Sequence, residues 1–555
     1  MGIFSNYGFA MGELVFKFFN GYTENAMPTQ EETLLNIMER NKDTEIGKKY
    51  GFADIKTIAD FQKKVPISTF ESYIPLIERT MNGEETVITG DKILRYCESS
   101  GSAGKPKIQP KTTRDVWNMY LLGFVGTLGC ISAYFKENGR KKMPTQKGPL
   151  LMSLNGHKLP NGKMSNGAGQ LPFQYIKPIL NIFITTPKDI LFPEDEPNTD
   201  ILYFQLLTSL TERNITYLGS MVITMLTQMF EYLEDNWEML VDDIEKGTLN
   251  SSVRCPQSLR KKYGHRRPNP KRAKELREIF SQGFDKEPIA LKIWPKLLYG
   301  YGMTGSTLMV YAEKLKRYVG DLPMHNMGYA ASEGFMAMCV DMNVQDYVLL
   351  PRSLIYEFIP VDEPDIEVPL TLDKLEIGKD YEIIITNFSG LYRYRIMDIV
   401  RCTGDYNNSK KIQFLYRSNM GLNVANEKTT TDMLDIAAQK IEEHFGIKLE
   451  SYSYYGDTSD REAKYMLLLE TNADFNPDEI SEYLDKIMAE INSKYGKYRS
   501  WGMIGMPEIK RLKNGAYARY KAELVKNGRI INQIKPVTVI NTPEKKEFFF
   551  GEIEG

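Results

Sequence analysis

The sequence predicts an α/β protein with a large N-terminal domain of mixed sheets and helices, residues 1–417, and a small α+β domain, residues 418–555. Three observations favour this division. The chain has 555 residues, more than a single hydrophobic core usually serves. Strand-like runs alternate with helical patterns along the first 417 residues. After Arg417 a second compact pattern of strands and helices begins and continues for about 140 residues.

Hydrophobic periodicity assigns the individual elements. Apolar residues spaced for one helix face, among charged residues, predict helices at residues 30–48, 58–65 and 221–245. Runs rich in β-branched and aromatic residues predict strands at residues 93–97, 215–219, 381–386 and 410–416. In the small domain we expect, in order, a helix at 430–444, strands at 451–455 and 465–470, a helix at 477–495 and two short strands.

Composition and charge exclude several classes of protein. Lys and Arg number 70 and Asp and Glu 72, so no overall field attracts nucleic acid or an anionic membrane. Apolar runs fall short of the ~18 residues of a membrane span, and the amino terminus lacks a secretory pattern, so we expect a cytoplasmic protein without membrane contact. Five scattered cysteines without a Cys-x-x-Cys pair favour neither disulfides nor a zinc site.

The segment 98–107 is the first motif that carries chemistry: Glu-Ser-Ser-Gly-Ser-Ala-Gly-Lys-Pro-Lys. Glycines let backbone N–H groups approach phosphate oxygens, while serine hydroxyls and a lysine add donors and charge. The spacing differs from the Walker pattern. It resembles the phosphate-binding loop of the adenylate-forming superfamily at every fixed position but one. The loop residues expected to bind ATP are Ser99, Ser100, Gly101, Ser102, Ala103 and Lys107.

Residues 328–334, Gly-Tyr-Ala-Ala-Ser-Glu-Gly, form the second motif. It is similar to the superfamily's Tyr-Gly-x-Ser/Thr-Glu. That similarity implies an adenine stacked on Tyr329, an α-phosphate bound by the Ser332 hydroxyl and Mg²⁺ held by Glu333. Ala330 and Ala331 stand between these residues and belong to the expected ATP site. A helix with Ser332 as its N-cap would explain the same residues equally well.

Residues 390–400 form the third motif and resemble the superfamily's Tyr-Arg-x-Gly-Asp, whose aspartate accepts hydrogen bonds from both ribose hydroxyls. The resemblance gives this role to Asp398 and puts Met397 where the superfamily has glycine. The alternative is an amphipathic strand in which Arg393 and Arg395 pair with surface acids. The three motifs follow one another in the superfamily's order, which chance explains less readily than any single motif.

Over nearly its whole length the chain resembles the auxin-responsive family of acyl-acid amido synthetases, a branch of the luciferase-like adenylate formers. The most diagnostic stretches are residues 417–429, ending in Asn-Glu-Lys-Thr, and residues 531–535, Ile-Asn-Gln-Ile-Lys. The resemblance implies that Lys535 is a catalytic lysine between the substrate carboxylate and the α-phosphate, and that Arg417 belongs to the ATP site. Pro-Val-Thr after Lys535 and a shorter phosphate loop differ from the plant enzymes and indicate a non-plant member.

The activity that the resemblance implies uses ATP and Mg²⁺. A small carboxylic acid becomes an acyl-adenylate with release of pyrophosphate, and an amino acid's amine then takes the acyl group. The small domain would move between the two steps, with Ser418 and Asn419 at the hinge. We expect a monomer or a weak homodimer.

Two substrate sites are predicted from position along the chain. The acyl pocket is expected to contain Trp117, Tyr120, Leu121, Met221 and Thr224, although such a helix stripe can also be plain core. Asn166 and Gly167, in the glycine-rich segment 165–169, are expected to bind the carboxylate of the acceptor amino acid. A simple surface turn is the alternative there.

Three other functions remain open at this stage. Coenzyme A could replace the amine as acceptor, or a degenerate member could bind nucleotide or acyl ligand as a sensor. Residues 254–274 are rich in Lys and Arg, so they could bind anions or nucleic acid, or form a solvated helix face. Intact Glu333, Asp398 and Lys535 favour the enzyme.

Overall fold

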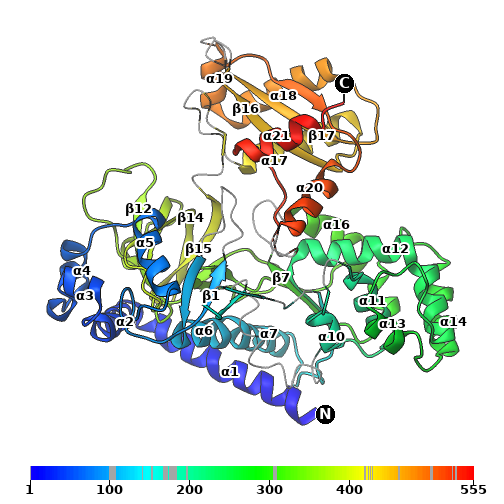
Figure 1. The fold of residues 1–555 in the computed structure, drawn as a ribbon, viewed down its shortest axis with the longest axis horizontal. Helices are drawn as coiled ribbons and strands as arrows, with labels where there is room; N and C mark the ends of the chain where they lie inside the picture. Colours follow the sequence, from blue (N-terminus) through cyan, green and yellow to red (C-terminus); the bar gives the residue numbers. More distant parts are fainter. Residues whose placement is uncertain are drawn as a thin grey trace. The chain divides into compact units, whose positions relative to one another are not determined.

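The computed structural model describes all residues except 1, 99–107, 141, 152–153, 155, 160, 167–172, 174–183, 196–197, 304–308, 418–420, 423, 425–426, 428, 430, 460–462, 501–503, 528, 530, 532–533 and 555. The chain divides into two compact units (Figure 1). The large unit contains Met1–Ser99, Ile108–Ile396 and Val400–Phe414. The small unit contains Ser100–Lys107, Met397–Ile399 and Leu415–Gly555. Its main segment begins at Leu415, close to the boundary that we predict at residue 418.

Three sheets form the framework of the large unit. The first has the order β12-β13-β14-β15-β11-β10-β9 and consists of β9 Tyr329–Ala331, β10 Gly334–Met338, β11 Tyr347–Leu349, β12 Ile355–Pro360, β13 Asp380–Thr386, β14 Tyr394–Tyr406 and β15 Ser409–Arg417. The second is parallel, with the order β3-β6-β7-β8, and consists of β3 Leu150–Leu151, β6 Tyr217–Val222, β7 Tyr299–Met303 and β8 Met324–His325. The third has the order β2-β1-β5-β4 and consists of β1 Ile93–Glu98, β2 Ile108–Thr112, β4 His157–Lys158 and β5 Met164–Asn166.

Helices cover these sheets in two groups that Figure 1 shows on opposite flanks of the unit. The first group, in blue, packs with the seven-stranded sheet into one core and consists of α2 Ala26–Asn41, α3 Glu45–Tyr50, η1 Phe52–Asp54, α4 Ile58–Lys64 and α5 Phe70–Met81. The second, in green, forms another core and consists of α10 Lys188–Leu191, α11 Ile201–Thr211, α12 Ile223–Lys246, α13 Gln257–Tyr263, α14 Pro270–Phe280, α15 Ala290–Ile293 and α16 Met309–Val319. A short η5, Leu372–Lys374, precedes β13.

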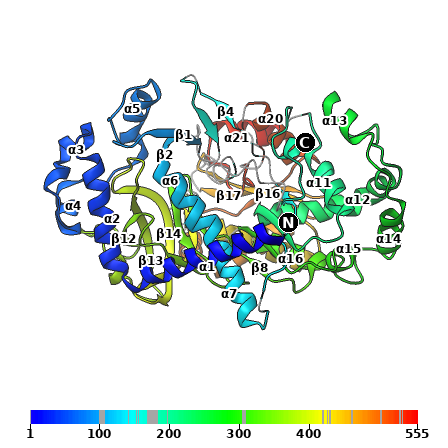
Figure 2. The same cartoon turned by 90° about the horizontal axis from the view of Figure 1, so that it is seen from below.

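Helix α1, Gly2–Glu24, crosses α7, Gly126–Glu137, at two glycines (Figure 2). A Cβ atom on Gly12 would lie 2.6 Å from the backbone nitrogen of Gly129, and one on Gly129 would lie 2.3 Å from the carbonyl oxygen of Gly12. The two backbones therefore touch where they cross, which only residues without a side chain allow. The contact fixes the direction of α7 and of the helical segments before it.

One helical run among the described residues, Thr113–Glu137, is long and apolar enough to cross a membrane. It consists of α6 Thr113–Asn118, the π-helix η2 Met119–Val125, and α7. In its most apolar window, 61% of the surface is buried inside the protein. Its apolar side chains pack with Phe335 and Met338 of β10. It is therefore a buried core helix.

The small unit is an α+β structure around an antiparallel pair, β16 Ser451–Asp457 with β17 Lys464–Glu470, and a third strand, β18 Glu508–Arg511, parallel to β17. Its helices are α17 Thr431–Phe445, α18 Pro477–Ile491, α19 Ser493–Ser500, α20 Ala516–Lys526 and α21 Pro543–Gly551. The α/β class and the α+β character of the small unit agree with the sequence prediction.

Two predicted helices are each divided in two. The helix expected at residues 30–48 ends at Asn41, and the hydroxyl of Thr44 then caps a new helix by accepting from the Gly47 backbone at 2.9 Å. A single continuous helix is thereby interrupted by a local cap, which hydrophobic periodicity does not detect. The helix expected at 477–495 likewise ends before Asn492, and α19 begins one residue later.

Candidate active site

The second motif forms a tight β-hairpin. Strands β9 and β10 pair with Ala331 opposite Gly334, so Ser332 and Glu333 are the two residues of the turn. The alternative of a helix capped by Ser332 is therefore wrong. Ala330 is exposed, whereas Ala331 and Ser332 are half-buried and Glu333 is only 7% exposed.

The carboxylate of Glu333 is held from a neighbouring strand. The Gln109 amide nitrogen donates to its Oε1 at 2.6 Å, and the Asn387 amide donates to the Glu333 carbonyl oxygen at 2.8 Å. Gln109 lies on β2, two residues after the end of the predicted phosphate loop. The sequence analysis does not single out Gln109 or Asn387. Gln109 and Lys111 are polar residues two apart in a buried strand, which puts them on one face, and this spacing is the signal that could have revealed them.

Lys111 extends the same buried network. Its ammonium donates to the Asp115 carboxylate at 2.6 Å and to the Glu333 carbonyl oxygen at 3.1 Å. Asp115 also accepts from the Ser389 hydroxyl at 2.8 Å. Burial by itself would lower the pKa of Lys111, but the charges of Asp115, Cys97 and Glu333 outweigh it and the pKa is raised. Lys111 is therefore a fixed positive charge in the network.

The charges in this network do not balance, because one ammonium faces two carboxylates, those of Asp115 and Glu333. In addition, Oε1 of Gln109 is buried without a hydrogen-bond partner among the described residues. A hard divalent cation prefers oxygen ligands, and the Glu333 carboxylate and the Gln109 amide oxygen supply them. The residues present thus fit Mg²⁺. The described residues, those of this network included, contain no group of three or more His, Cys, Asp or Glu placed to hold a metal, so the fit rests on the Glu333 carboxylate and the Gln109 amide oxygen.

Tyr329, the predicted adenine residue, lies on β9 and is buried. Its ring centroid lies 6.2 Å from that of Tyr347 and 5.8 Å from that of Phe414. These two aromatic neighbours fix the plane of the Tyr329 ring, and both are residues of the same sheet.

Three predicted ATP-site residues meet in the small unit. Arg417 donates from Nε to Oδ1 of Asp398 at 2.6 Å and from Nη2 to Oδ2 at 3.2 Å. The Lys535 side chain remains exposed, yet the pKa of its ammonium is lowered, first by the protein atoms crowded around it and then by repulsion from Arg417, while Asp398 opposes the shift. Residues far apart in the sequence thus form one charged cluster.

Met397 has a backbone φ of +65°. This left-handed conformation favours glycine, and the superfamily motif has glycine at this position. The departure in sequence therefore does not change the backbone beside Asp398.

The two arginines of the third motif have structural partners. Buried Arg393 donates to both carboxylate oxygens of Glu357 and to the carbonyl oxygens of Gln62 and Val65. Arg395 pairs with Glu382 at 2.7 Å. Both arginines pair with acids, as the alternative interpretation expects, but Glu357 and Glu382 are both buried rather than on the surface.

Four aromatic rings connect the predicted acyl pocket to a buried cluster. Trp117 contacts Tyr120 edge to face, Tyr120 stacks on Phe124, and Phe124 contacts Phe173, with successive centroids 5.6, 6.2 and 5.1 Å apart. Met221 packs against the cluster that contains Phe173. Leu121 and Trp117 are exposed, and the side chain of Thr224 lies outside the described residues. Phe124 and Phe173 were not predicted, and Phe124 follows Tyr120 at the spacing of one helix face.

The predicted phosphate-loop residues Ser99 to Ala103 and Lys107, and Gly167, Ser418 and Asn419, lie outside the described residues. The strands that lead into two of these segments are described. β1 and β5 are parallel neighbours, with Cys97 paired with Asn166. β1 and β5 therefore end side by side, at Glu98 and Asn166. Ser165 and Asn166 form the end of a strand, so the surface-turn alternative is wrong for these two residues.

The basic segment 254–274 has internal partners. Arg254 pairs with Asp200 at 2.8 Å and Lys262 with Asp189 at 2.6 Å. Arg266 donates to three backbone carbonyl oxygens, and Arg272 donates to the carbonyl oxygens of Leu210 and Ile293. These charges stabilise the helical region around α13 and α14, which favours the structural interpretation over an anion-binding one.

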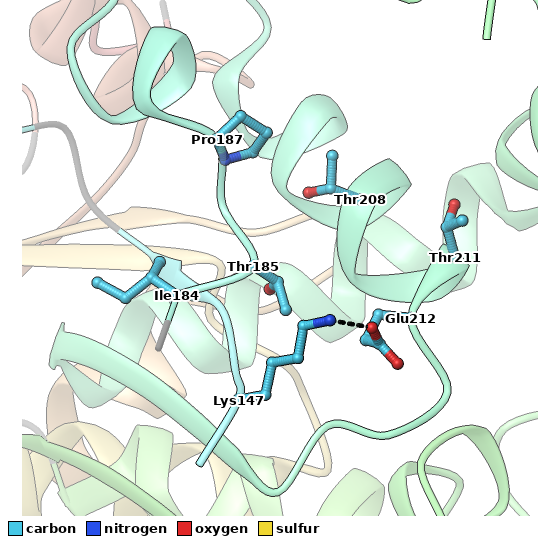
Figure 3. Close-up of a pocket in the computed structure, with 7 residues that line it drawn as sticks. All are labelled: Lys147, Ile184, Thr185, Pro187, Thr208, Thr211 and Glu212. Atoms are coloured by element: carbon cyan, nitrogen blue, oxygen red, sulfur yellow. Dashed lines mark hydrogen bonds and ion pairs between the residues drawn. The ribbon is translucent and has the colours of Figure 1, made fainter. Parts of the chain in front are cut away.

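A surface hollow of about 400 Å³ lies at the end of α11 (Figure 3). It is lined by Lys147, Ile184, Thr185, Pro187, Thr208, Thr211 and Glu212. Lys147 and Glu212 form an ion pair across it, and the hydrogen bond from Lys147 holds the pKa of Glu212 below its ordinary value although burial alone would raise it. The hollow contains none of the predicted site residues, and its two charges compensate each other.

Comparison with known protein families matches three consecutive regions: the GH3 family N-terminal domain at residues 15–324, the central domain at 347–417 and the C-terminal domain at 431–544. These matches cover most of the chain, and they define an acyl acid amido synthetase class. The chain belongs to the GH3 family. The resemblance found in the sequence is thus confirmed.

Its curated relatives include an indole-3-acetic acid-amido synthetase, GH3.3 of Arabidopsis thaliana, 28% identical across 95% of this chain and 92% of the relative. A jasmonoyl-L-amino acid synthetase, JAR4 of Nicotiana attenuata, is 27% identical across 94% and 92%. Among solved structures, GH3.15 acyl acid amido synthetase matches with a TM-score of 0.84 and 25% identity, across 97% of this chain and 96% of that one. A 2-hydroxyisobutyryl-CoA ligase shares the fold, with a TM-score of 0.51 and 10% identity across 93% and 89%.

Proposed function

We propose that this protein is an ATP-dependent acyl-acid amido synthetase that joins a small carboxylic acid to an amino acid. A carboxylate oxygen attacks the α-phosphorus of ATP and pyrophosphate leaves, which gives the acyl-adenylate. The amine nitrogen of the amino acid then attacks the acyl carbon, AMP leaves, and the nitrogen loses a proton. We also propose that the protein acts in the cytoplasm as a monomer or weak homodimer.

The observation that carries this proposal is the meeting of Asp398, Arg417 and Lys535 in the small unit. Asp398 accepts hydrogen bonds from the ribose hydroxyls, and Arg417 holds its carboxylate in a fixed orientation. Lys535 neutralises charge between the substrate carboxylate and the α-phosphate as they approach.

The remaining proposed contacts come from residues outside this cluster. Tyr329 stacks on adenine, Ser332 donates to the α-phosphate, and the loop residues 99–107 bind the phosphates. Glu333 and its network hold Mg²⁺, which when bound neutralises the charge of the phosphates and of the leaving pyrophosphate. Asn166 and Gly167 bind the acceptor's carboxylate.

An aromatic or other apolar acid fits the proposed acyl pocket, because Trp117, Tyr120 and Phe124 present ring surfaces in succession. The relatives' names include indole-3-acetic acid and jasmonate, and we leave the individual acid to experiment.

A screen of carboxylic acids crossed with amino acids tests the proposal. Pyrophosphate release that depends on an acid, followed by an acid–amino-acid conjugate identified by mass, is the expected result. Coenzyme A is added in a parallel arm, and a thioester in place of the amide would identify a CoA ligase instead. Absence of pyrophosphate release with every acid, while ATP still binds, would indicate a nucleotide-binding protein without this activity.

A further inference from the structure

Gln109 is buried beside the carboxylate that we propose for Mg²⁺. It is 1% exposed, and its amide nitrogen lies 2.6 Å from Oε1 of Glu333. The orientation of the amide follows from this contact, because an ionised carboxylate only accepts hydrogen bonds. The nitrogen must be the atom that meets Oε1 of Glu333, so the amide oxygen takes no part in this contact. That oxygen is buried and has no hydrogen-bond partner among the described residues.

A buried amide oxygen without a partner is unfavourable, so its presence requires an explanation. Among the described residues, the neighbouring network has one ammonium, that of Lys111, for two carboxylates, those of Asp115 and Glu333. These are two independent observations at one place. A hard cation would give the amide oxygen a partner and would supply the second positive charge. A purely structural network would explain neither observation.

We infer that Gln109 is a second protein ligand of the metal site, with its amide oxygen on the divalent cation and its N–H group on Glu333. The inference rests on the proposed function, because the cation would arrive with ATP. One side chain thereby does two things: it binds the metal, and it leaves Glu333 a single oxygen, Oε2, for the same ion. Position supports the assignment, since Gln109 stands on β2 directly after the proposed phosphate loop.

The test measures metal binding rather than turnover. Mn²⁺ replaces Mg²⁺, α,β-methylene-ATP occupies the nucleotide site of the full-length protein, and free Mn²⁺ is followed by electron paramagnetic resonance. Gln109→Met removes both the oxygen and the N–H group at nearly equal size. Gln109→Glu keeps an oxygen and removes the N–H group. Gln62→Met is the matched control, because the Gln62 amide also donates to a glutamate, Glu357, at 2.9 Å in the same unit.

We expect Gln109→Met to weaken Mn²⁺ binding about 10- to 100-fold, and Gln109→Glu and Gln62→Met to bind within a few-fold of the unmodified protein. Unchanged binding in Gln109→Met would overturn the assignment. Equal loss in Gln109→Met and Gln109→Glu would also overturn it, because the N–H group alone would then matter. If Gln109→Met fails to fold, Gln109→Asn replaces it, since its shorter amide cannot reach the site.

The outcomes separate this inference from the proposed function. If metal binding depends on Gln109 but no acid supports pyrophosphate release, Gln109 is a metal ligand and the proposed reaction is wrong. Pyrophosphate release with metal binding unaffected by Gln109→Met would keep the reaction and reject the ligand. Absence of Mn²⁺ binding by the unmodified protein with nucleotide present would reject both.

Discussion

Arg417 and Asp398 form a two-point ion pair, with Nε 2.6 Å from Oδ1 and Nη2 3.2 Å from Oδ2. The carboxylate is buried and the guanidinium is partly exposed. Each carboxylate oxygen keeps a lone pair after accepting one hydrogen bond, so the pair can still accept from a diol. This arrangement suits a ribose contact and leads to the first prediction.

Asp398→Ala should weaken ATP binding by about 1–3 kcal/mol, because hydrogen bonds to a neutral sugar are lost but phosphate contacts remain. Isothermal titration calorimetry measures the change. Asp380→Ala is the control, since Asp380 forms a similar two-point pair with Arg401 at 2.7 and 2.9 Å on an exposed part of the sheet. Equal affinity in the Asp398 and Asp380 variants would reject the ribose contact.

Lys535→Ala should slow adenylation about 10²- to 10³-fold and leave acyl transfer nearly intact. Synthetic acyl-adenylate supplied to the variant should therefore restore conjugate formation, as single-turnover assays would show. Lys513, an exposed lysine of the same unit, provides the control substitution. Equal loss of both half-reactions would show that Lys535 acts elsewhere or maintains the fold.

The rate of adenylation should decline at a lower pH than the pKa of an ordinary lysine would predict. The pKa of Lys535 is lowered, first by the protein atoms around its ammonium and then by Arg417, and the rate requires the protonated ammonium. The rate should therefore fall as pH rises through that lowered pKa. Lys535→Arg keeps its charge at every accessible pH, so the decline should move to higher pH in that variant.

Asp435 makes the small unit more stable at mildly acidic pH. Burial, together with repulsion from Asp432, raises the pKa of Asp435 to about 7, against the hydrogen bonds from Tyr452 and Thr538. Because the folded state holds the proton more tightly than the unfolded state, this group's contribution to stability falls as pH rises from about 4 to 7. Asp435→Asn should remove that dependence and stabilise the protein at pH 8 by no more than about 4 kcal/mol.

Urea denaturation at pH 5 and pH 8 measures this effect. Asp485→Asn is the opposite control: Asp485 also accepts from a tyrosine, Tyr495 at 2.7 Å, but pairs with Arg499. Its replacement should destabilise the small unit at both pH values. A loss of stability in Asp435→Asn at pH 8 would show that the ionised carboxylate is needed.

Phe124→Leu should change which acids are activated, by about 10-fold or more in kcat/KM, because it opens space between Tyr120 and Phe173. The KM for ATP should not change. Phe280→Leu disturbs a comparable stacked pair, with Phe284 at 5.6 Å, in the other core and serves as control. Identical acid preferences in both variants would show that Phe124 is only a core residue.

Local motifs in the sequence were enough to propose part of the candidate site. Asp398, Arg417 and Lys535 were named from short patterns, and the structure brings them together. Gln109, Lys111 and Asn387 were missed because each has an ordinary neighbourhood in sequence. Gln109 and Lys111 contact the β9–β10 turn from β2, more than 200 residues away in the chain, and Asn387 contacts it from 54 residues away. Such non-local contacts produce no periodic pattern in the sequence.

The predicted boundaries of one helix were wrong because they also depend on a specific contact. Thr44 divides one predicted helix because its hydroxyl caps the next, and Gly47 lies so close to Asn41 that a Cβ there would be 1.9 Å from the Asn41 carbonyl oxygen. Helix propensity and the hydrophobic pattern do not change at this point. They therefore do not reveal the cap that separates the two helices.

The π-helix Met119–Val125 belongs to the helical segment of the proposed acyl pocket, and the loss of one residue there could alter the pocket. A π-helix holds one residue more per hydrogen-bonded ring than an α-helix, so deleting a single residue there could restore the α-helical pattern without breaking the helix. Because α7 is locked to α1 by Gly12 and Gly129, the deletion would turn the opposite end by about 100°. Trp117 would then face a different direction, while the adenylation residues on the sheets stayed in place. In this protein, substrate choice could therefore evolve through insertions and deletions as well as through substitutions.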